Sequence, residues 1–200
     1  MKLNSCINLV VVALIFVSGC KNSTKLDTEA AEIWRKSKNS SFLNAQTTPI
    51  PTEELSSFAG LKYFEYDPKW VVSAKIMRVY GALPTEMAAT QNQFEQYIKV
   101  GYLAFEFEQK NYKLDAYQSV GSTEATKWFV PFADLSAGVT TYETGRYLDL
   151  DVPPNVQTLN LNFNYAYNPY CAYNSNFVCP IPPATNFLNV VVQAGEKKYH

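Results

Sequence analysis

Histidine is almost absent from this chain, since the single histidine of the 200 residues is His200. A Ser-His-Asp or Cys-His arrangement needs an imidazole beside its nucleophile, and many metal sites use imidazole ligands. We therefore expect neither of these two chemistries, no metal site and no cofactor. A glycine-rich loop of the kind that cradles phosphates is also missing.

An excess of charge of one sign is missing as well. The chain has 17 basic and 18 acidic residues, which gives a formal net charge of −1 at pH 7. Proteins that bind nucleic acids depend on a positive field, so we expect no nucleic-acid partner. The hydrophobic share of 47% and the charged share of 18% are typical of a globular protein. A single domain is the natural expectation at this length.

Long hydrophobic runs are limited to residues 9–17 (LVVVALIFV), which is too short to cross a bilayer and follows the positive Lys2. The next residues, Val17-Ser18-Gly19-Cys20, resemble a bacterial lipobox. We expect residues 1–19 to be a cleaved lipoprotein signal peptide, and Cys20 to be acylated and to hold the protein in the lipid bilayer. The alternatives are a plain secretory peptide and a short uncleaved anchor. Because Lys21 follows Cys20, the expected location is the bacterial outer membrane, facing the periplasm or the cell exterior.

Cysteine is scarce: once Cys6 is removed and Cys20 is acylated, only Cys171 and Cys179 remain as thiols. In an oxidising compartment, two such thiols are expected to form a structural disulfide. A zinc site would need two further ligands, and a redox-active pair usually has the closer CxxC spacing.

Alternating apolar and polar residues predict a mainly β protein, an antiparallel β-sandwich or small β-barrel with a short N-terminal helix. The helix is expected to begin near Asp27 and Thr28 and to end near Lys38. We divide the mature chain into residues 20–50, a lipidated tether, short helix and connector, and residues 51–200, a single β-rich domain. The expected strands and apolar runs lie at residues 70–77, 103–108, 112–116, 127–132, 147–150, 158–163 and 187–192, of which 103–108 and 112–116 form a hairpin.

Residues 162–183 (NFNYAYNPYCAYNSNFVCPIPP) have an unusual composition, in which tyrosines are interleaved with asparagines and followed by prolines. Tyrosine offers an apolar face with a polar tip, and asparagine can hold turns through its side chain. The segment either caps one end of the β domain or lines a pocket for a small ligand. A tyrosine-rich surface also suits a protein interface.

The other candidates lie outside this segment and comprise an arginine, two tyrosines and three acidic residues. Arg146 could clamp a carboxylate or phosphate, or could pair internally and hold a loop. Asp134 or Glu143 could act as a base, and Tyr142 as an acid; Glu196 is a further acidic candidate. The candidate ligand-binding residues are Asp134, Tyr142, Arg146, Tyr147, Asn164, Tyr167, Asn168, Tyr170 and Tyr173.

Several motifs together resemble the domain of unknown function 1684 family, over nearly all of the mature chain. They are FAGLKYF at residues 58–64, PFAD at 131–134, GRYL at 145–148, FNYAYNPYCAYN at 163–174, CPIPP at 179–183 and AGEK at 194–197. The resemblance implies a shared fold and no particular reaction. At three positions where the family pattern has an acidic residue, this chain has Thr141, Asn162 and Thr185.

Three functions of different classes fit the sequence. The first, which we favour, is a lipid-anchored, non-catalytic module that binds a small ligand through the Tyr/Asn-rich segment and Arg146. The second is a histidine-independent enzyme, such as a hydrolase, which uses Asp134, Glu143 or Tyr142 with Arg146. The third is an envelope protein whose tyrosine segment binds a partner protein.

Overall fold

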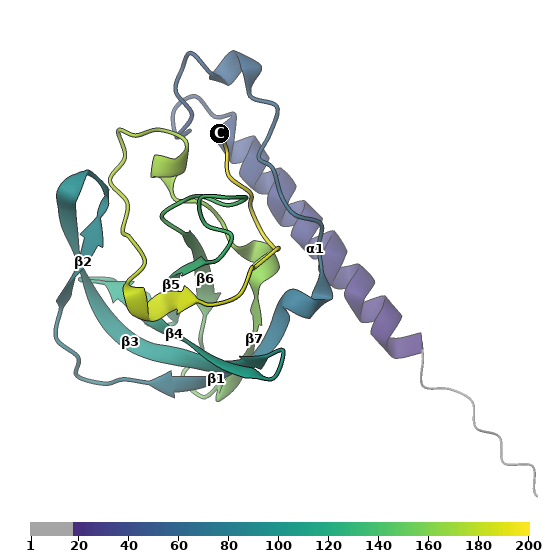
Figure 1. The fold of residues 1–200 in the computed structure, drawn as a ribbon, viewed down its shortest axis with the longest axis vertical. Coiled ribbons are helices and arrows are strands. Elements are labelled where there is room, and N and C mark those ends of the chain that lie inside the picture. The colour runs from purple at the N-terminus through teal and green to yellow at the C-terminus, as the bar shows by residue number, and fades with distance from the viewer. Residues whose placement is uncertain (1–17) are drawn as a thin grey trace, which may run out of the picture.

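The computed structural model describes residues 18–200, with side chains from residue 25 onward, so most of the expected signal peptide lies outside the described residues. The chain begins with the helix α1 (Ser18–Phe42) and continues into a curled, mainly antiparallel sheet that forms a half-barrel (Figure 1). The expectation of a mainly β fold with an N-terminal helix is confirmed, and the curled sheet corresponds to the barrel alternative rather than to two stacked sheets.

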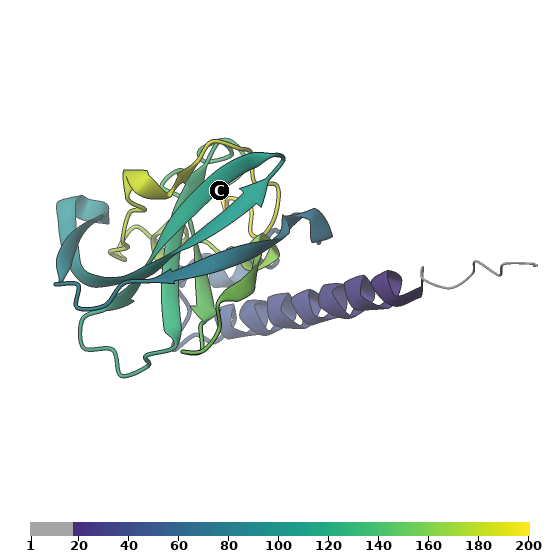
Figure 2. The ribbon, with the colours of Figure 1, turned by 90° about the horizontal axis from the view of Figure 1, so that it is seen from below.

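The helix α1 is longer than the sequence suggested, since it has 25 residues instead of the dozen expected between Asp27 and Lys38. Residues 21–25, which were expected to be a polar tether, are therefore helical. Residues 20–48 contain no glycine or proline, so nothing in this stretch breaks a helix. Both views show the first turns of α1 extending beyond the sheet (Figures 1 and 2). No helix within residues 18–200 is both long and apolar enough to cross a membrane.

The sheet has the strand order β6-β5-β4-β3-β1-β7, with β2 paired to β3 and the short β8 paired in parallel to β5. Its strands are β1 (Val71–Arg78), β2 (Thr85–Ala89), β3 (Gln93–Phe107), β4 (Lys110–Ser119), β5 (Lys127–Asp134), β6 (Arg146–Asp151), β7 (Thr158–Asn162) and β8 (Phe187–Leu188).

The predicted hairpin is confirmed as β3 and β4, which pair from Phe107 and Lys110 onward. Its turn residues Glu108 and Gln109 both have positive φ angles, of 48° and 61°, as a two-residue hairpin turn requires. The strand β2 and the first half of β3 were not predicted. The strand β2 has five residues, and its two buried residues, Met87 and Ala89, flank the exposed Ala88, so its sequence carries only one period of the alternation that marks a strand.

Two of the three apolar clusters of the described residues position the site, and the third consists of Met87, Tyr97 and Tyr117. The larger fills the concave face of the sheet and includes Trp70, Trp128 and Phe163. The smaller lies beneath the end of α1 and is built around Phe42 and Tyr173. Because Phe42 belongs to α1 and Tyr173 to the Tyr/Asn-rich segment, this second cluster fixes the helix against the segment.

The C-terminal half of α1 packs on the β domain through residues spaced at helical intervals. Ala31 and Phe42 are buried, and the ring of Trp34 contacts the edges of Tyr63 and Tyr165, with centroids 6.1 and 5.3 Å apart. The amide oxygen of Asn39 accepts the backbone N–H of Leu61 at 2.9 Å. The helix therefore positions its side chains rigidly beside the sheet.

Candidate functional site

The Tyr/Asn-rich segment, residues 162–183, crosses from the end of β7 along the edge of β6. It includes two 3-10 turns, η4 (Phe163–Tyr165) and η5 (Tyr170–Ala172). Backbone hydrogen bonds of 2.9 and 3.0 Å in both directions between Tyr147 and Tyr167 join it to β6. Two of the clefts that the segment lines differ in chemistry, and we call them the polar cleft and the aromatic cleft.

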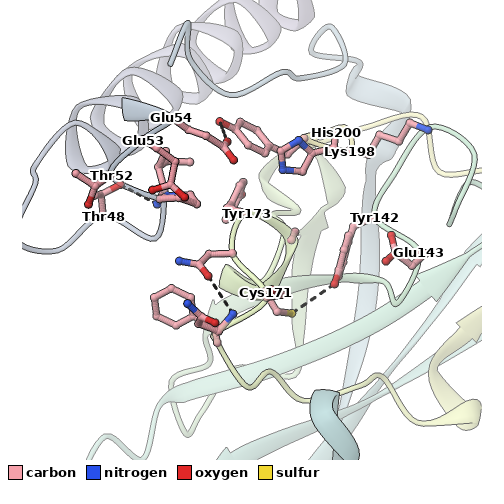
Figure 3. A pocket seen from close by; sticks show the side chains of 18 of the residues that line it. Thr48, Thr52, Glu53, Glu54, Tyr142, Glu143, Cys171, Tyr173, Lys198 and His200 are labelled. Carbon is pink, nitrogen blue, oxygen red and sulfur yellow. Dashed lines mark hydrogen bonds between the residues drawn. The ribbon is translucent and has the colours of Figure 1, made fainter. Parts of the chain in front are cut away.

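The polar cleft has a volume of about 980 Å³ and is shown in Figure 3. Thr48, Thr52 and Glu53 lie on one side, Tyr142 and Glu143 lie on the other, and Cys171 and Tyr173 lie between them. Further lining residues are Glu54, Asn174, Ser175, Asn176, Phe177, Lys198, Tyr199 and His200. The cleft therefore brings together the connector after α1, the turn before β6, the Tyr/Asn-rich segment and the last residues of the chain.

Cys171 and Cys179 are free thiols, so the predicted disulfide is not present in the structure. Hydrogen bonds hold both sulfur atoms instead. The hydroxyl of Tyr142 donates to Sγ of Cys171 at 3.7 Å, and the backbone N–H of Cys171 donates to Sγ of Cys179 at 3.0 Å (Figure 3 shows the first of these).

The two thiols differ in acidity. A hydrogen bond from Cys179, supported by the one from Tyr142 and opposed by burial, lowers the pKa of Cys171 to about 7. The same pairing with Cys171, together with burial, raises the pKa of Cys179. Burial also raises the pKa of the Tyr142 hydroxyl, so this group remains a donor to the sulfur.

The aromatic cleft has a volume of about 480 Å³ and lies between α1, the sheet and the other side of the Tyr/Asn-rich segment. Its charged lining residues are Lys38 and Asp149. Its eight aromatic lining residues are Trp34, Phe42, Tyr97, Phe129, Tyr147, Tyr167, Tyr170 and Phe177. The aromatic lining makes this cleft suited to apolar ring systems, in contrast to the polar cleft.

A buried ion pair between Lys38 and Glu196 joins α1 to the C-terminal residues, with Nζ and Oε2 2.8 Å apart. Glu196 also accepts the backbone N–H of Asn168 at 3.2 Å, the amide of Asn168 at 3.1 Å and the hydroxyl of Tyr173. Burial lowers the pKa of Lys38, and the nearby carboxylate of Glu196 opposes this effect. The ammonium group lies 4.6 Å from the ring centre of Tyr167, which adds a cation–π contact.

Arg146 is fully buried and binds internal groups. One terminal nitrogen donates to Oδ2 of Asp134 at 2.9 Å and to the carbonyl of Val192 at 3.0 Å. The other donates to the carbonyls of Ala194 and Glu196. Asp134, 2% exposed, also accepts the backbone N–H of Val192 at 3.0 Å. Arg146 and Asp134 thus hold residues 192–196 in place, which is the internal role that the sequence left open.

The candidate asparagines are buried and support the backbone. The side chain of Asn164 binds both the N–H and the carbonyl of Asp67 at 2.9 Å. The side chain of Asn168 donates to Glu196 and to the carbonyl of Lys197. The structure therefore separates the candidate residues into three groups. Tyr142 and Tyr173 line the polar cleft, Tyr147, Tyr167 and Tyr170 line the aromatic cleft, and Asp134, Arg146, Asn164 and Asn168 lie in the interior.

The three positions that depart from the family's acidic pattern make structural hydrogen bonds. Asn162 caps η4 by accepting the N–H of Asn164 at 3.0 Å. Thr141 is bonded to the hydroxyl of Ser136 at 2.8 Å, and Thr185 donates to Asp115 at 3.2 Å. At these three positions, uncharged polar side chains therefore make the hydrogen bonds that support the fold.

Sequence reasoning did not nominate the residues that α1 and the connector after it supply. Lys38, Phe42, Glu53 and Glu54 line the clefts although they lie more than 80 residues before the Tyr/Asn-rich segment. The apolar spacing of α1 could have indicated a packed face, but it gave no indication of what the helix packs against. Within the described part of the chain, no group of three or more His, Cys, Asp or Glu side chains is placed to hold a metal ion.

The fold and its two clefts define a half-barrel protein with an N-terminal helix packed against its open side. The chain belongs to the family described as "Protein of unknown function (DUF1684)", whose profile matches residues 56–197. It is similar to an uncharacterized protein of Haloarcula marismortui whose structure was solved by solution NMR. The two share 31% identity with a TM-score of 0.70, over 88% of this chain and 96% of the other. Among curated proteins, none matches this chain.

Proposed function

We propose that this protein is a lipid-anchored protein of the cell envelope and a non-catalytic binding module, and that the polar cleft binds a small, neutral, polyhydroxylated ligand such as a saccharide. The observation that carries this proposal is the cleft itself. Its volume of about 980 Å³ is sufficient for a small ligand. Its walls combine tyrosine rings with amide, hydroxyl and carboxylate groups, which together can bind both the faces and the hydroxyls of a sugar.

The charges of the polar cleft favour a neutral ligand over an anion. Glu53, Glu54 and Glu143 contribute three carboxylates, whereas Lys198 contributes one ammonium group. Glu53 and Glu143 make no hydrogen bond or ion pair with other residues in the range 18–200, so their oxygens are available as acceptors. Hydroxyl groups can donate to these carboxylates and accept from the asparagine amides.

The interior position of Arg146 and Asp134 argues against the enzyme alternative in its original form. Asp134 and Arg146 are buried with internal partners, whereas Glu143 is exposed at the rim of the polar cleft. Tyr142 and Glu143 both line the polar cleft, but Arg146, with which the enzyme alternative combines them, does not. A binding role does not require Arg146 in the cleft.

The proposed anchor is Cys20, which lies near the beginning of α1. From Cys20 to Phe42 the helix spans about 34 Å at 1.5 Å per residue. Because its first turns extend beyond the sheet (Figures 1 and 2), the acyl chain would hold the β domain at a distance from the membrane. Metabolic labelling with a radiolabelled fatty acid tests this part. The unchanged protein should incorporate the label, and label on Cys20→Ala would overturn the anchor.

Thermal unfolding with a panel of neutral saccharides tests the polar cleft. A ligand at 100 times its Kd should stabilise the folded state by about 2.7 kcal/mol, which raises Tm by about 5–11 °C for a chain of this size. Glu143→Gln should weaken binding about tenfold, because a charged acceptor is replaced by a neutral one.

The matched control is Glu106→Gln, on the exposed face of β3, which should leave the affinity unchanged. The proposal fails if no saccharide raises Tm. It also fails if Glu143→Gln and the control variant bind the ligand equally well.

A further inference from the structure

The aromatic cleft has a chemistry that the polar cleft lacks, and it is independent of the function proposed above. We propose that the aromatic cleft is a second binding site, and that its ligand is a planar aromatic carboxylate. Three features carry this inference: rings that are already ordered, tyrosine hydroxyls that are already bonded, and one ammonium group among the rings.

The rings of the aromatic cleft hold one another in fixed positions. Tyr97 is stacked on Phe129 with centroids 5.5 Å apart, and Phe129 meets the edge of Tyr147 at 4.7 Å. Tyr147 in turn meets Tyr167 at 5.8 Å with an interplanar angle of 89°. Such a chain of contacts orders the wall before a ligand arrives, so binding costs little side-chain entropy.

Three tyrosine hydroxyls of this wall already donate hydrogen bonds to other groups of the protein. Tyr147 donates to the carbonyl of Pro180, Tyr167 donates to Asp149 at 2.7 Å, and Tyr97 donates to Glu95 at 3.0 Å. The tyrosines therefore present mainly ring surface to the cleft. Ring surface favours a flat, apolar body that can stack or meet the rings edge-on.

Among the described residues that line the cleft, Lys38 is the one cation. Its ammonium group has three N–H donors; Glu196 is its ion-pair partner, at 2.8 Å, and Asp149 acts on it at longer range. The negative charge of Glu196 is also shared with Asn168 and Tyr173. An ammonium group that lies among aromatic rings and has N–H donors beyond the one that binds Glu196 favours a ligand with an anionic acceptor.

The size of the cleft limits the ligand to a small ring system. A volume of about 480 Å³ lies in the range of small-molecule sites and suits a body of one or two fused rings. Asp149 lies at an exposed position of the lining and is bonded to Tyr167. The carboxylate of the ligand is therefore expected to point toward Lys38 and away from Asp149.

The first experiment compares two probes that differ only in charge, naphthalene-2-carboxylate and naphthalene-2-carboxamide, by isothermal titration calorimetry with the full chain. The carboxylate should bind about tenfold more tightly, because a charge-assisted hydrogen bond is stronger than a neutral one. Equal affinities, or no binding of either probe, would overturn the proposal.

Two variants then locate the site. Lys38→Met should remove the preference for the carboxylate, whereas Lys36→Met, on the exposed face of the same helix, should retain it. Tyr170→Ala should weaken both probes by a similar factor, because it removes a ring of the wall that is 49% exposed and contributes little to the core.

Lys38→Met leaves the buried Glu196 without its cation and can therefore destabilise the fold. Tyr170→Ala does not disturb this ion pair and provides an independent test. If Lys38→Met does not fold, the probe comparison and Tyr170→Ala still decide the matter. Unchanged affinity of Tyr170→Ala for both probes would place their binding elsewhere and refute the assignment. The saccharide experiment can succeed or fail independently, because it concerns residues of the polar cleft.

Discussion

Replacing Arg146 by methionine removes the cation of a fully buried ion pair and keeps most of the side-chain volume. Asp134, only 2% exposed, would retain two backbone donors, from Ser136 and Val192, and would lose its charged partner. Three carbonyls of residues 192–196 would lose their donors at the same time. Breaking a buried pair on one side costs about 3–5 kcal/mol. We therefore expect the free energy of unfolding to fall by about 4 kcal/mol.

Urea denaturation followed by circular dichroism measures this loss directly, and thermal unfolding should show a Tm lower by about 8–16 °C. Lys127→Met is the matched control, because Lys127 and Asp151 form an ion pair whose side chains are 53% and 57% exposed. Solvent screens such a pair, so the control should unfold at the same denaturant concentration as the unchanged protein.

A double variant separates the loss of charge from the loss of packing. Arg146→Met combined with Asp134→Leu leaves no uncompensated charge, so it should regain part of the stability lost by Arg146→Met alone. A loss below about 1 kcal/mol for Arg146→Met would refute the reasoning, since a typical surface substitution costs no more than that. Arg146 would then not hold residues 192–196.

Two further predictions concern titration. Burial raises the pKa of Tyr147 and Tyr173, so the stability that they contribute is complete below pH 10 and is lost as the pH rises further, by about 1.4 kcal/mol per tyrosine per pH unit. Absorbance at 295 nm should therefore show these tyrosines ionising together with the loss of circular dichroism, and ionisation near pH 10 in the folded protein would contradict this. Because the pKa of Cys171 is lowered to about 7, iodoacetamide should modify Cys171 before Cys179, with a rate that reaches half of its maximum near pH 7. Peptide mapping measures both sites, and a disulfide-linked peptide would contradict the free thiols.

The strands that could be predicted are those with one buried face. In β1, buried and exposed positions alternate over most of its length, and alternation of this kind is visible in the sequence. In β4, the alternation stops at residues 114–117, which are all buried. The first half of β3 differs, because residues 93–96 of its sequence are mostly exposed. Its strand conformation depends on pairing with β2 and β4, which are determined by the fold rather than by local composition.

The burial of charged side chains on α1 could not be predicted from the sequence. The sequence indicated only that the helix ends near Lys38, whereas in the structure Arg35 is 7% exposed and Lys38 is paired with the buried Glu196. The sequence separates Lys38 and Glu196 by 158 positions. Only the packing of α1 on residues 192–199 brings the two together, so no local pattern could predict the charged residue of the aromatic cleft.

Composition distinguished the Tyr/Asn-rich segment from the rest of the chain but could not assign directions to its side chains. Asn168 and Tyr173 face inward to Glu196, whereas Tyr170 is 49% exposed and lines the aromatic cleft. The segment has little regular secondary structure, so neither the two-residue nor the 3.6-residue period applies to it.

The interior polar residues and the two clefts are parts of one arrangement. Arg146 binds the carbonyls of residues 192–196, which places the carboxylate of Glu196 where Lys38, Asn168 and Tyr173 can reach it. Glu196 thereby fixes α1 on one side and the Tyr/Asn-rich segment on the other. Both clefts lie along that segment, so their shapes depend on a network of buried hydrogen bonds and charges rather than on apolar packing alone. Asn162, Asn164 and Asn168 of the segment therefore serve as structural residues, whereas Asn174 and Asn176 line the polar cleft.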